Sequence, residues 1–148
     1  MYKKILVAID DSETSASALR EALLIAKASS AKLYIAHVAD AMLMSMHGRT
    51  FSSTLNIEHA IVEINNAGRA LLDNAIKSAD GIDAETLLLE TRNRRISEIL
   101  SEKAKELGVD LIIIGRHGQR GLATLILGST AEQLAKIATA SVLLVRKH

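Results

Sequence analysis

Short apolar runs alternate along this chain with longer segments whose apolar residues recur at helical spacing. The apolar runs predict strands at residues 5–9, 33–38, 86–89, 111–114 and 142–145. The segments between them predict helices at residues 12–29, 57–76, 93–107 and 130–139, and Gly108 follows the third helix as a C-cap glycine. Strands that are apolar throughout and separated by helices are typical of a parallel sheet covered on both faces. We therefore expect a three-layer α/β/α fold around a five-stranded parallel sheet.

The composition narrows the class of protein. A length of 148 residues predicts one domain spanning residues 1–148. The 18 Lys and Arg residues nearly balance the 17 Asp and Glu residues, which argues against a protein that coats nucleic acid or an anionic membrane. One Phe, two Tyr and no Trp leave little surface for stacking single-stranded bases. With no Cys, the chain has no disulfides, thiol nucleophiles or Cys-based zinc sites.

Targeting and membrane signals are missing from the sequence. The apolar run at residues 5–9 is interrupted by Asp10 and Asp11, so it is too short for a signal peptide. No run approaches the roughly 20 apolar residues of a membrane span. We expect a cytoplasmic protein.

Ligands of open parallel sheets bind at the carboxyl ends of the strands, where the strand order reverses. Two strand orders are common for such a chain. In the Rossmann-like order 3-2-1-4-5, the reversal lies between the first and fourth strands. The segments that would meet there are residues 10–12 and the segment after Ile114.

Half of the eight glycines lie in one stretch after the fourth strand: Gly115, Gly118, Gly121 and Gly128. Glycine lets a phosphate approach the backbone closely, and free N–H groups before a helix attract anions. The Ser129 and Thr130 hydroxyls and the charges of Arg116 and Arg120 favour the same ligand. The alternative is a surface loop before a capped helix, because Ser129 and Glu132 have capping-box spacing.

The spacing Gly115-x2-Gly118-x9-Gly128-Ser129 resembles the glycine motif of the ATP-binding branch of the universal stress protein A family. The resemblance covers nearly the whole chain, including residues 4–13, 36–38 and 110–115. It implies the Rossmann-like, adenine nucleotide alpha hydrolase-like fold with strand order 3-2-1-4-5. It also implies that adenine lies between the ends of the first and second strands and that the glycine loop surrounds the phosphates.

Carried over residue by residue, the resemblance implies a set of binding positions. The adenosine pocket would be lined by Ala8, Ile9 and Asp10, with Val38 against the base. Ribose and phosphates would contact Gly115, Arg116, His117 and Gly118, and further phosphate contacts would come from Gly128, Ser129 and Thr130. The implied cofactor is ATP, with Mg²⁺ or Mn²⁺ carried on its phosphates.

Some of these positions have alternative interpretations. Asp10 and Glu13 have cap spacing, so Asp10 is alternatively only an acidic residue at a helix start. Arg116 stands where the family often has a small residue, and it either strengthens phosphate binding or points into solvent. Two prolines frequent in the family, near Ala8 and at Ser141, are absent here, which leaves the local loop shape open.

The function that follows is a nucleotide-dependent stress-response or signalling module with an unidentified protein partner. Hydrolysis should be slow at most, because no Walker lysine follows a glycine. An apolar edge strand invites pairing with another chain, so we expect a homodimer through residues 142–146, as in the family. The alternative is a scaffold of the same fold that binds another nucleotide such as AMP, or none, and acts through protein partners.

Two other function classes fit less well. A phospho-acceptor receiver domain requires an aspartate after the third strand, where this chain has Glu90 and Thr91. A dinucleotide oxidoreductase requires its glycines after the first strand, where residues 10–13 contain none.

Three further groups of residues are given structural interpretations. The methionine segment Met42, Met44 and Met46, followed by His47, is interpreted as an apolar lid or partner surface rather than a metal site. Arg92, Arg94 and Arg95, with Asn93 as a helix cap, are interpreted as a solvated face; an acidic partner or a second phosphate is the alternative. We expect His37 to be a core or near-core residue with a hydrogen-bond partner. No His pair has the spacing of a helical metal site.

Overall fold

The computed structural model describes residues 1–40, 54–117 and 127–147. The strands are β1 (Lys4–Ala8), β2 (Lys32–Ala39), β3 (Ala84–Glu90), β4 (Leu111–Gly115) and β5 (Ser141–Val145). The helices are α1 (Glu13–Ser29), α3 (Thr54–Ile76), α4 (Ile96–Leu107) and α5 (Ser129–Ile137). The alternation predicted from the sequence is confirmed, and the predicted boundaries differ by a few residues.

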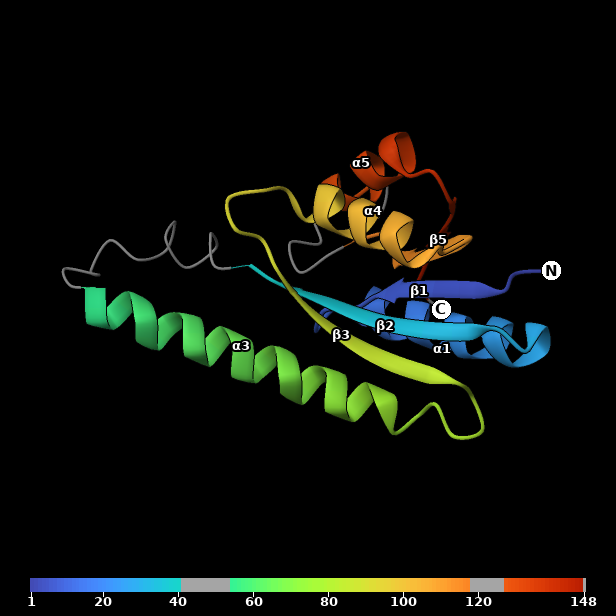
Figure 1. Cartoon of the computed structure of the whole chain (residues 1–148), viewed down its shortest axis with the longest axis horizontal. Helices are drawn as coiled ribbons and strands as arrows, with labels where there is room; N and C mark the ends of the chain where they lie inside the picture. Colours follow the sequence, from blue (N-terminus) through green and yellow to red (C-terminus); the bar gives the residue numbers. More distant parts are fainter. Residues whose placement is uncertain (41–53, 118–126, 148) are drawn as a thin grey trace.

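The strands form one sheet in the order β3-β2-β1-β4-β5, and every neighbouring pair is parallel. Helices α1 and α3 cover one face of this sheet and α4 and α5 cover the other (Figure 1). The predicted three-layer fold and strand order are therefore confirmed. Because β2 and β3 extend from one side of β1 and β4 from the other, the strand order reverses between β1 and β4, the position at which ligands of such sheets bind.

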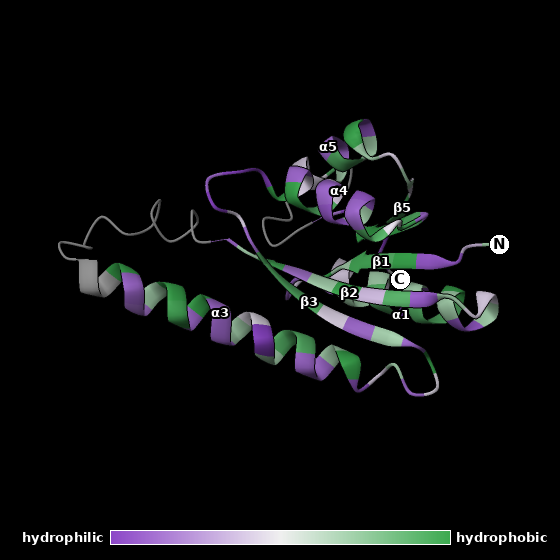
Figure 2. Ribbon diagram, in the orientation of Figure 1, coloured by the Kyte–Doolittle hydropathy of each residue, from purple (hydrophilic) through white to green (hydrophobic). Residues whose placement is uncertain are grey.

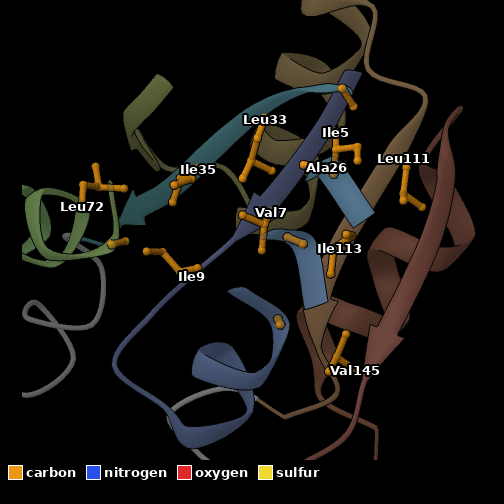
Figure 3. Close-up of a cluster of buried hydrophobic side chains, with 14 residues drawn as sticks. Ile5, Val7, Ile9, Ala26, Leu33, Ile35, Leu72, Leu111, Ile113 and Val145 are labelled. Atoms are coloured by element: carbon orange, nitrogen blue, oxygen red, sulfur yellow. The ribbon is translucent and has the colours of Figure 1, made fainter. Parts of the chain in front are cut away.

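Strand residues alternate between two cores because successive side chains point to opposite faces of a sheet. Ile5 and Val7 pack beneath α1 and α3, together with Ile113 of β4 (Figure 3). Leu6 and Ile112 pack beneath α4 and α5. β1 is hydrophobic beyond its N-terminal end, whereas the helices show bands of both kinds (Figure 2). This double burial explains why the strands read as continuous apolar runs.

Helix α3 approaches the sheet closely at Gly68. A Cβ on this residue would lie 2.8 Å from Leu88 Cδ1 and 2.9 Å from His37 Cδ2. A glycine in a helix interior costs about 1 kcal/mol relative to alanine, and the close contact explains it here. The half-buried imidazole of His37 lies under this helix, and its Nδ1 is 2.8 Å from the Ile9 carbonyl oxygen. The prediction of a hydrogen-bonded histidine in or near the core is confirmed, in its near-core form.

The start of α4 differs from the prediction. Asn93 is not its cap: the helix starts at Ile96, and the Arg95 N–H donates to the Glu98 carboxylate at 3.4 Å. Arg92 and Asn93 instead occupy left-handed backbone conformations, with φ of 41° and 64°. They form a turn that the Arg94 N–H closes by donating to the Thr91 carbonyl at 2.8 Å. Sequence spacing alone did not show that these residues are used in a turn.

The arginines of this loop are exposed. Arg92 lies 3.6 Å from a Glu90 carboxylate oxygen, and Arg94 lies 2.5 Å from one of Glu102. This agrees with the interpretation of a solvated face beside the edge strand β3. Met42, Met44, Met46 and His47 lie outside the described residues, as do Gly118, Arg120 and Gly121. Among the helices of the described ranges, none combines the length and hydrophobicity required to cross a bilayer.

Candidate functional site

The peptide joining Ile9 and Asp10 is held on both sides where β1 leaves the sheet. The Ile9 N–H donates to the Ala36 carbonyl at 2.8 Å and continues the ladder with β2. The Ile9 carbonyl lies 2.8 Å from His37 Nδ1, and the Asp10 N–H donates to Ser15 Oγ at 2.7 Å. Ser15 is 4% exposed, so its hydroxyl is a fixed acceptor. These bonds set the direction of the chain into α1 and the position of Asp10.

The turn between β1 and α1 is built from side-chain bonds. The Ser12 N–H donates to Asp10 Oδ1 at 2.8 Å, and the Ser15 N–H donates to Ser12 Oγ at 3.2 Å. Ser12 is therefore the N-cap of α1, and the alternative in which Asp10 and Glu13 form the cap is wrong. Asp10 lies outside the helix, before its N-cap Ser12, and is half-buried at the carboxyl end of β1.

The end of β4 packs directly against the first turn of α1. A Cβ at Gly115 would lie 2.8 Å from Thr14 Oγ1 and 2.9 Å from the Thr14 carbonyl carbon. The Thr14 hydroxyl donates to the carbonyl oxygen of His117, two residues beyond β4. The absence of a side chain at Gly115 is thus explained by helix packing. This packing neither supports nor excludes a contact between Gly115 and a nucleotide.

Arg116 connects β5 with the start of α5. Its N–H donates to the Val145 carbonyl at 2.8 Å, and its carbonyl accepts the Gly128 N–H at 2.8 Å. Gly128 is the N-cap of α5, and no side chain caps this helix end. The predicted capping box is wrong, since Ser129 lies inside the helix and the Glu132 carboxylate pairs with Lys136 Nζ at 3.0 Å. The uncapped helix end, with a basic residue bonded to it through the backbone, favours an anion.

The sheet register shows which predicted residues lie on one face. Ala8 and Val38 belong to the core beneath α4 and α5. Strand alternation places Asp10 and Arg116 on this same side, beyond the ends of β1 and β4. The Ile9 side chain, in contrast, packs on the opposite face with Val7 and Leu72 (Figure 3). Only the backbone of Ile9 lies at the site.

The remaining predicted positions are distributed along the β4 and α5 ends. His117 and Gly128 are half-buried, Thr130 is half-buried and Ser129 is exposed. Gly118 lies outside the described residues. In the described ranges, no group of three or more Asp, Glu or His side chains is arranged to hold a metal ion.

An ion pair joins the chain after β5 to the first turn of α1. Lys147 Nζ lies 2.5 Å from Glu13 Oε2. The hydrogen bond and the charge of Lys147 hold the pKa of the Glu13 carboxyl below its ordinary value. Glu13 is thereby paired with a cation, at the helix end where a negative charge is favourable.

Sequence reasoning missed Thr14 and Ser15 as supports of the site. Both are buried hydroxyl residues in the first turn of α1. The signal in the sequence is two consecutive hydroxyl residues shortly after a strand at the expected binding edge, whereas the burial that makes hydrogen-bond partners necessary follows only from the fold. The contact of His37 with Ile9 spans 28 residues of chain, and no local pattern predicts it.

Known proteins that resemble this chain identify its family. The model of the universal stress protein family matches residues 1–146. The chain is 39% identical to universal stress protein YxiE of Bacillus subtilis, with 99% of this chain and 100% of the relative covered. The solved structure of the protein MJ0577 matches with a TM-score of 0.84 and 25% identity, covering 100% and 98% of the two chains.

A universal stress protein solved in complex with cAMP matches with a TM-score of 0.71 and 27% identity. The match covers 99% of both chains. The glycine motif, the strand order and the full-length similarity agree. The chain belongs to the universal stress protein family.

Proposed function

We propose that this chain binds ATP at the carboxyl ends of β1 and β4 and acts in the cytoplasm as a nucleotide-dependent stress-response or signalling module. The observation that carries the proposal is the start of α5. Its N-cap is Gly128, no side chain caps it, and Arg116 is hydrogen-bonded to that glycine. Backbone N–H groups and a guanidinium together favour a phosphate chain.

The phosphate end of the site uses residues of β4 and α5. The N–H groups of Ser129 and Thr130 lie in the first turn of α5, where intrahelical acceptors are lacking. Their hydroxyls and the His117 ring add further donors. Mg²⁺ or Mn²⁺ would bind with the phosphates, because these hard cations prefer oxygen ligands.

The adenosine end uses residues of β1 and β2. Ala8 and Val38 offer apolar contact to a base, and Asp10 offers a carboxylate to ribose hydroxyls. The peptide between Ile9 and Asp10 is fixed by His37 and Ser15, so this part of the site is organised without a ligand. A relative solved in complex with cAMP supports an adenine nucleotide in this fold.

The same relative favours a second candidate, in which the ligand carries a single phosphate, such as AMP. In that case the chain acts as a scaffold that reads a mononucleotide through a protein partner. The two candidates differ in what the α5 end contributes. ATP should gain affinity from this end over AMP, whereas a mononucleotide site should bind both with similar affinity. In either case we expect hydrolysis to be slow or absent.

Isothermal titration of the purified chain with ATP and with AMP tests the site directly. Arg116→Gln should weaken ATP binding by about 10-fold or more, since charged hydrogen bonds contribute roughly 1.5–3 kcal/mol. Arg69→Gln is the control, because Arg69 is exposed on α3 on the opposite face of the sheet. Equal ATP affinity in wild type and Arg116→Gln would count against the phosphate site.

We also propose a homodimer through residues 142–146. β5 is an edge strand of the sheet, and it pairs only with β4 within the described chain. Val142, Leu143 and Leu144 are half-buried, and an apolar edge is favourable for pairing with a second copy.

A further inference from the structure

Thr91 carries a buried hydroxyl that no described residue satisfies. The residue is 2% exposed, and its Oγ1 has no hydrogen-bond partner in the described part of the chain. Burying a hydroxyl without a hydrogen bond costs about 1–3 kcal/mol. Such a group in a folded protein requires an explanation, and one explanation is a ligand.

The sheet register gives the direction of this side chain. The Thr91 N–H donates to the Ala39 carbonyl at 3.4 Å, which continues the β2–β3 ladder by one residue. Leu87 and Leu89 contact the core beneath α4 and α5. Because side chains alternate along a strand, Thr91 points to that same face, the one that carries Ala8 and Val38.

The distance from Thr91 to the base-binding positions is short. Val38 pairs directly with Leu89, so Thr91 is its diagonal neighbour across the two strands. A strand separation of about 4.8 Å and a rise of about 6.6 Å over two residues place their Cα atoms about 8 Å apart. A purine in contact with Val38 can span this separation with its far edge.

The turn after β3 holds Thr91 in place. The Thr91 carbonyl accepts the Arg94 N–H at 2.8 Å, and Arg92 and Asn93 between them have positive φ. Thr91 is therefore fixed by hydrogen bonds on both sides of its backbone. Because the backbone that carries it is held in place, the Thr91 side chain stays on this face of the sheet, and a hydroxyl there favours ligands that offer it a hydrogen-bonding group.

We propose that Thr91 is a specificity-determining residue whose hydroxyl hydrogen-bonds the edge of the base of the bound nucleotide. This inference rests on the proposed nucleotide site. The base supplies the hydrogen-bond partner that the hydroxyl lacks among the described residues of the free protein, so that the cost of burying it is recovered only when ligand is present. Thr91 thus lowers the stability of the free protein and increases its affinity for a purine.

The substitution Thr91→Val tests this directly because it exchanges the hydroxyl for a methyl group of similar shape. Removing an unsatisfied hydroxyl should raise the Tm of the free protein by about 2–4 °C. The same change should weaken ATP binding by about 3- to 10-fold, since it removes one neutral hydrogen bond. Thr91→Ser keeps the hydroxyl and should keep most of the affinity.

Ser29 provides a matched control. Its Oγ is also buried without a described partner, but Ser29 ends α1, at the opposite end of the strands from the site. Ser29→Ala should raise the Tm, because it also removes an unsatisfied hydroxyl, and should leave the ATP affinity unchanged. Titration calorimetry and thermal unfolding of the four proteins, wild type included, complete the experiment.

The outcomes separate the two proposals. A higher Tm together with weaker ATP binding in Thr91→Val supports the role of Thr91. Wild-type ATP affinity in Thr91→Val would overturn the role of Thr91 and leave the proposed function standing. A lower Tm in Thr91→Val would do the same, because it would show that the hydroxyl has a protein partner. If wild type binds neither ATP nor AMP, the proposed function fails and this inference fails with it.

Discussion

Ser15 Oγ lies 2.7 Å from the backbone nitrogen of Asp10, so a hydroxyl in the first turn of α1 fixes the residue that follows β1. The bond joins the helix to the carboxyl end of the central strand. Because Ser15 is 4% exposed, water cannot readily replace its hydroxyl. The geometry of the proposed site therefore depends on a residue that need not touch the ligand.

Ser15→Ala should lower both the stability and the ATP affinity. Leaving the Asp10 N–H without its acceptor costs about 1–3 kcal/mol of unfolding free energy. Urea unfolding measures this loss, and titration calorimetry measures the binding. Ser17 is the matched control: it is equally buried in α1, and its Oγ accepts from Arg20. Ser17→Ala should leave ATP affinity unchanged; a similar loss of affinity in both variants would show that Ser15 acts only through general stability.

Gly115→Ala should destabilise the protein by about 2–3 kcal/mol, because the new Cβ overlaps the first turn of α1. The overlap includes the Thr14 carbonyl carbon at 2.9 Å, so backbone has to move. Gly81→Ala is the comparison, since Gly81 has a φ of +75° and no atom within 4 Å of its Cβ position. It should cost about 1–2 kcal/mol from backbone strain alone.

A double-mutant cycle distinguishes the two causes. Thr14→Ala removes the Oγ1 that lies 2.8 Å from the Gly115 Cβ position. We expect the free energies of Thr14→Ala and Gly115→Ala to couple by at least about 0.5 kcal/mol, whereas those of Thr14→Ala and Gly81→Ala should add. Additivity in both pairs would mean that the contact between Thr14 and Gly115 does not limit the packing.

The Glu13–Lys147 pair should make a pH-dependent contribution to stability. The folded-state pKa of Glu13 is lowered, chiefly by its hydrogen bond with Lys147. The contribution is therefore present above the unfolded-state pKa of the carboxyl, about 4.3, and is lost as the pH falls through the lower folded-state pKa. Carboxyl ¹³C NMR titration should show the lowered pKa in wild type and its return toward the ordinary value in Lys147→Met.

Salt provides the second check on this pair. Both side chains are largely exposed, so about 1 M NaCl should screen their attraction and raise the Glu13 pKa in wild type. Lys147→Met should show little such change. A Glu13 pKa that is independent of both salt and Lys147 would contradict the pairing.

The proposed dimer predicts different effects of proline at neighbouring positions of β5. The Val145 carbonyl accepts from Arg116 and the Ser141 N–H donates to Asp110, so the odd-numbered residues of β5 bond to β4. The N–H of Val142 therefore points away from the sheet. Val142→Pro should keep the fold and yield a monomer by light scattering, because it removes a donor only from the outer edge.

Leu143→Pro is the contrast, since it removes an N–H that bonds to β4. It should lower the Tm strongly. A wild-type protein that is monomeric at micromolar concentration would contradict the dimer through residues 142–146.

The fold was largely predictable from the sequence because its strands are apolar on both faces. Residues such as Leu6 and Val7 are fully buried on opposite sides of the sheet, which is why they appear as an unbroken apolar run. The C-cap at Gly108, with a φ of 70°, followed from its position after the helix. These signals are local, and local signals are what a single sequence contains.

The site was predictable only in outline. The turn at Arg92 and Asn93 uses left-handed conformations that Arg rarely adopts, so the spacing pointed to a cap instead. Ser129 and Glu132 matched a capping box, yet α5 starts one residue earlier. The support of Asp10 by Ser15 and the approach of Thr14 to Gly115 depend on tertiary packing, which spacing does not encode.

The position of β1 at the centre of the sheet has a consequence for synthesis on the ribosome. β1 pairs with β2 on one side, but its other neighbour is β4, and the bond from the Lys3 N–H to Asp110 spans 107 residues. At a translation rate of about 5–20 residues per second, the edge of β1 that pairs with β4 stays unpaired for about 5–20 s. During this interval, one side of this largely apolar strand is open to chaperones or to another nascent chain. The acidic residues directly after it, Asp10 and Asp11, limit the length of the exposed apolar segment.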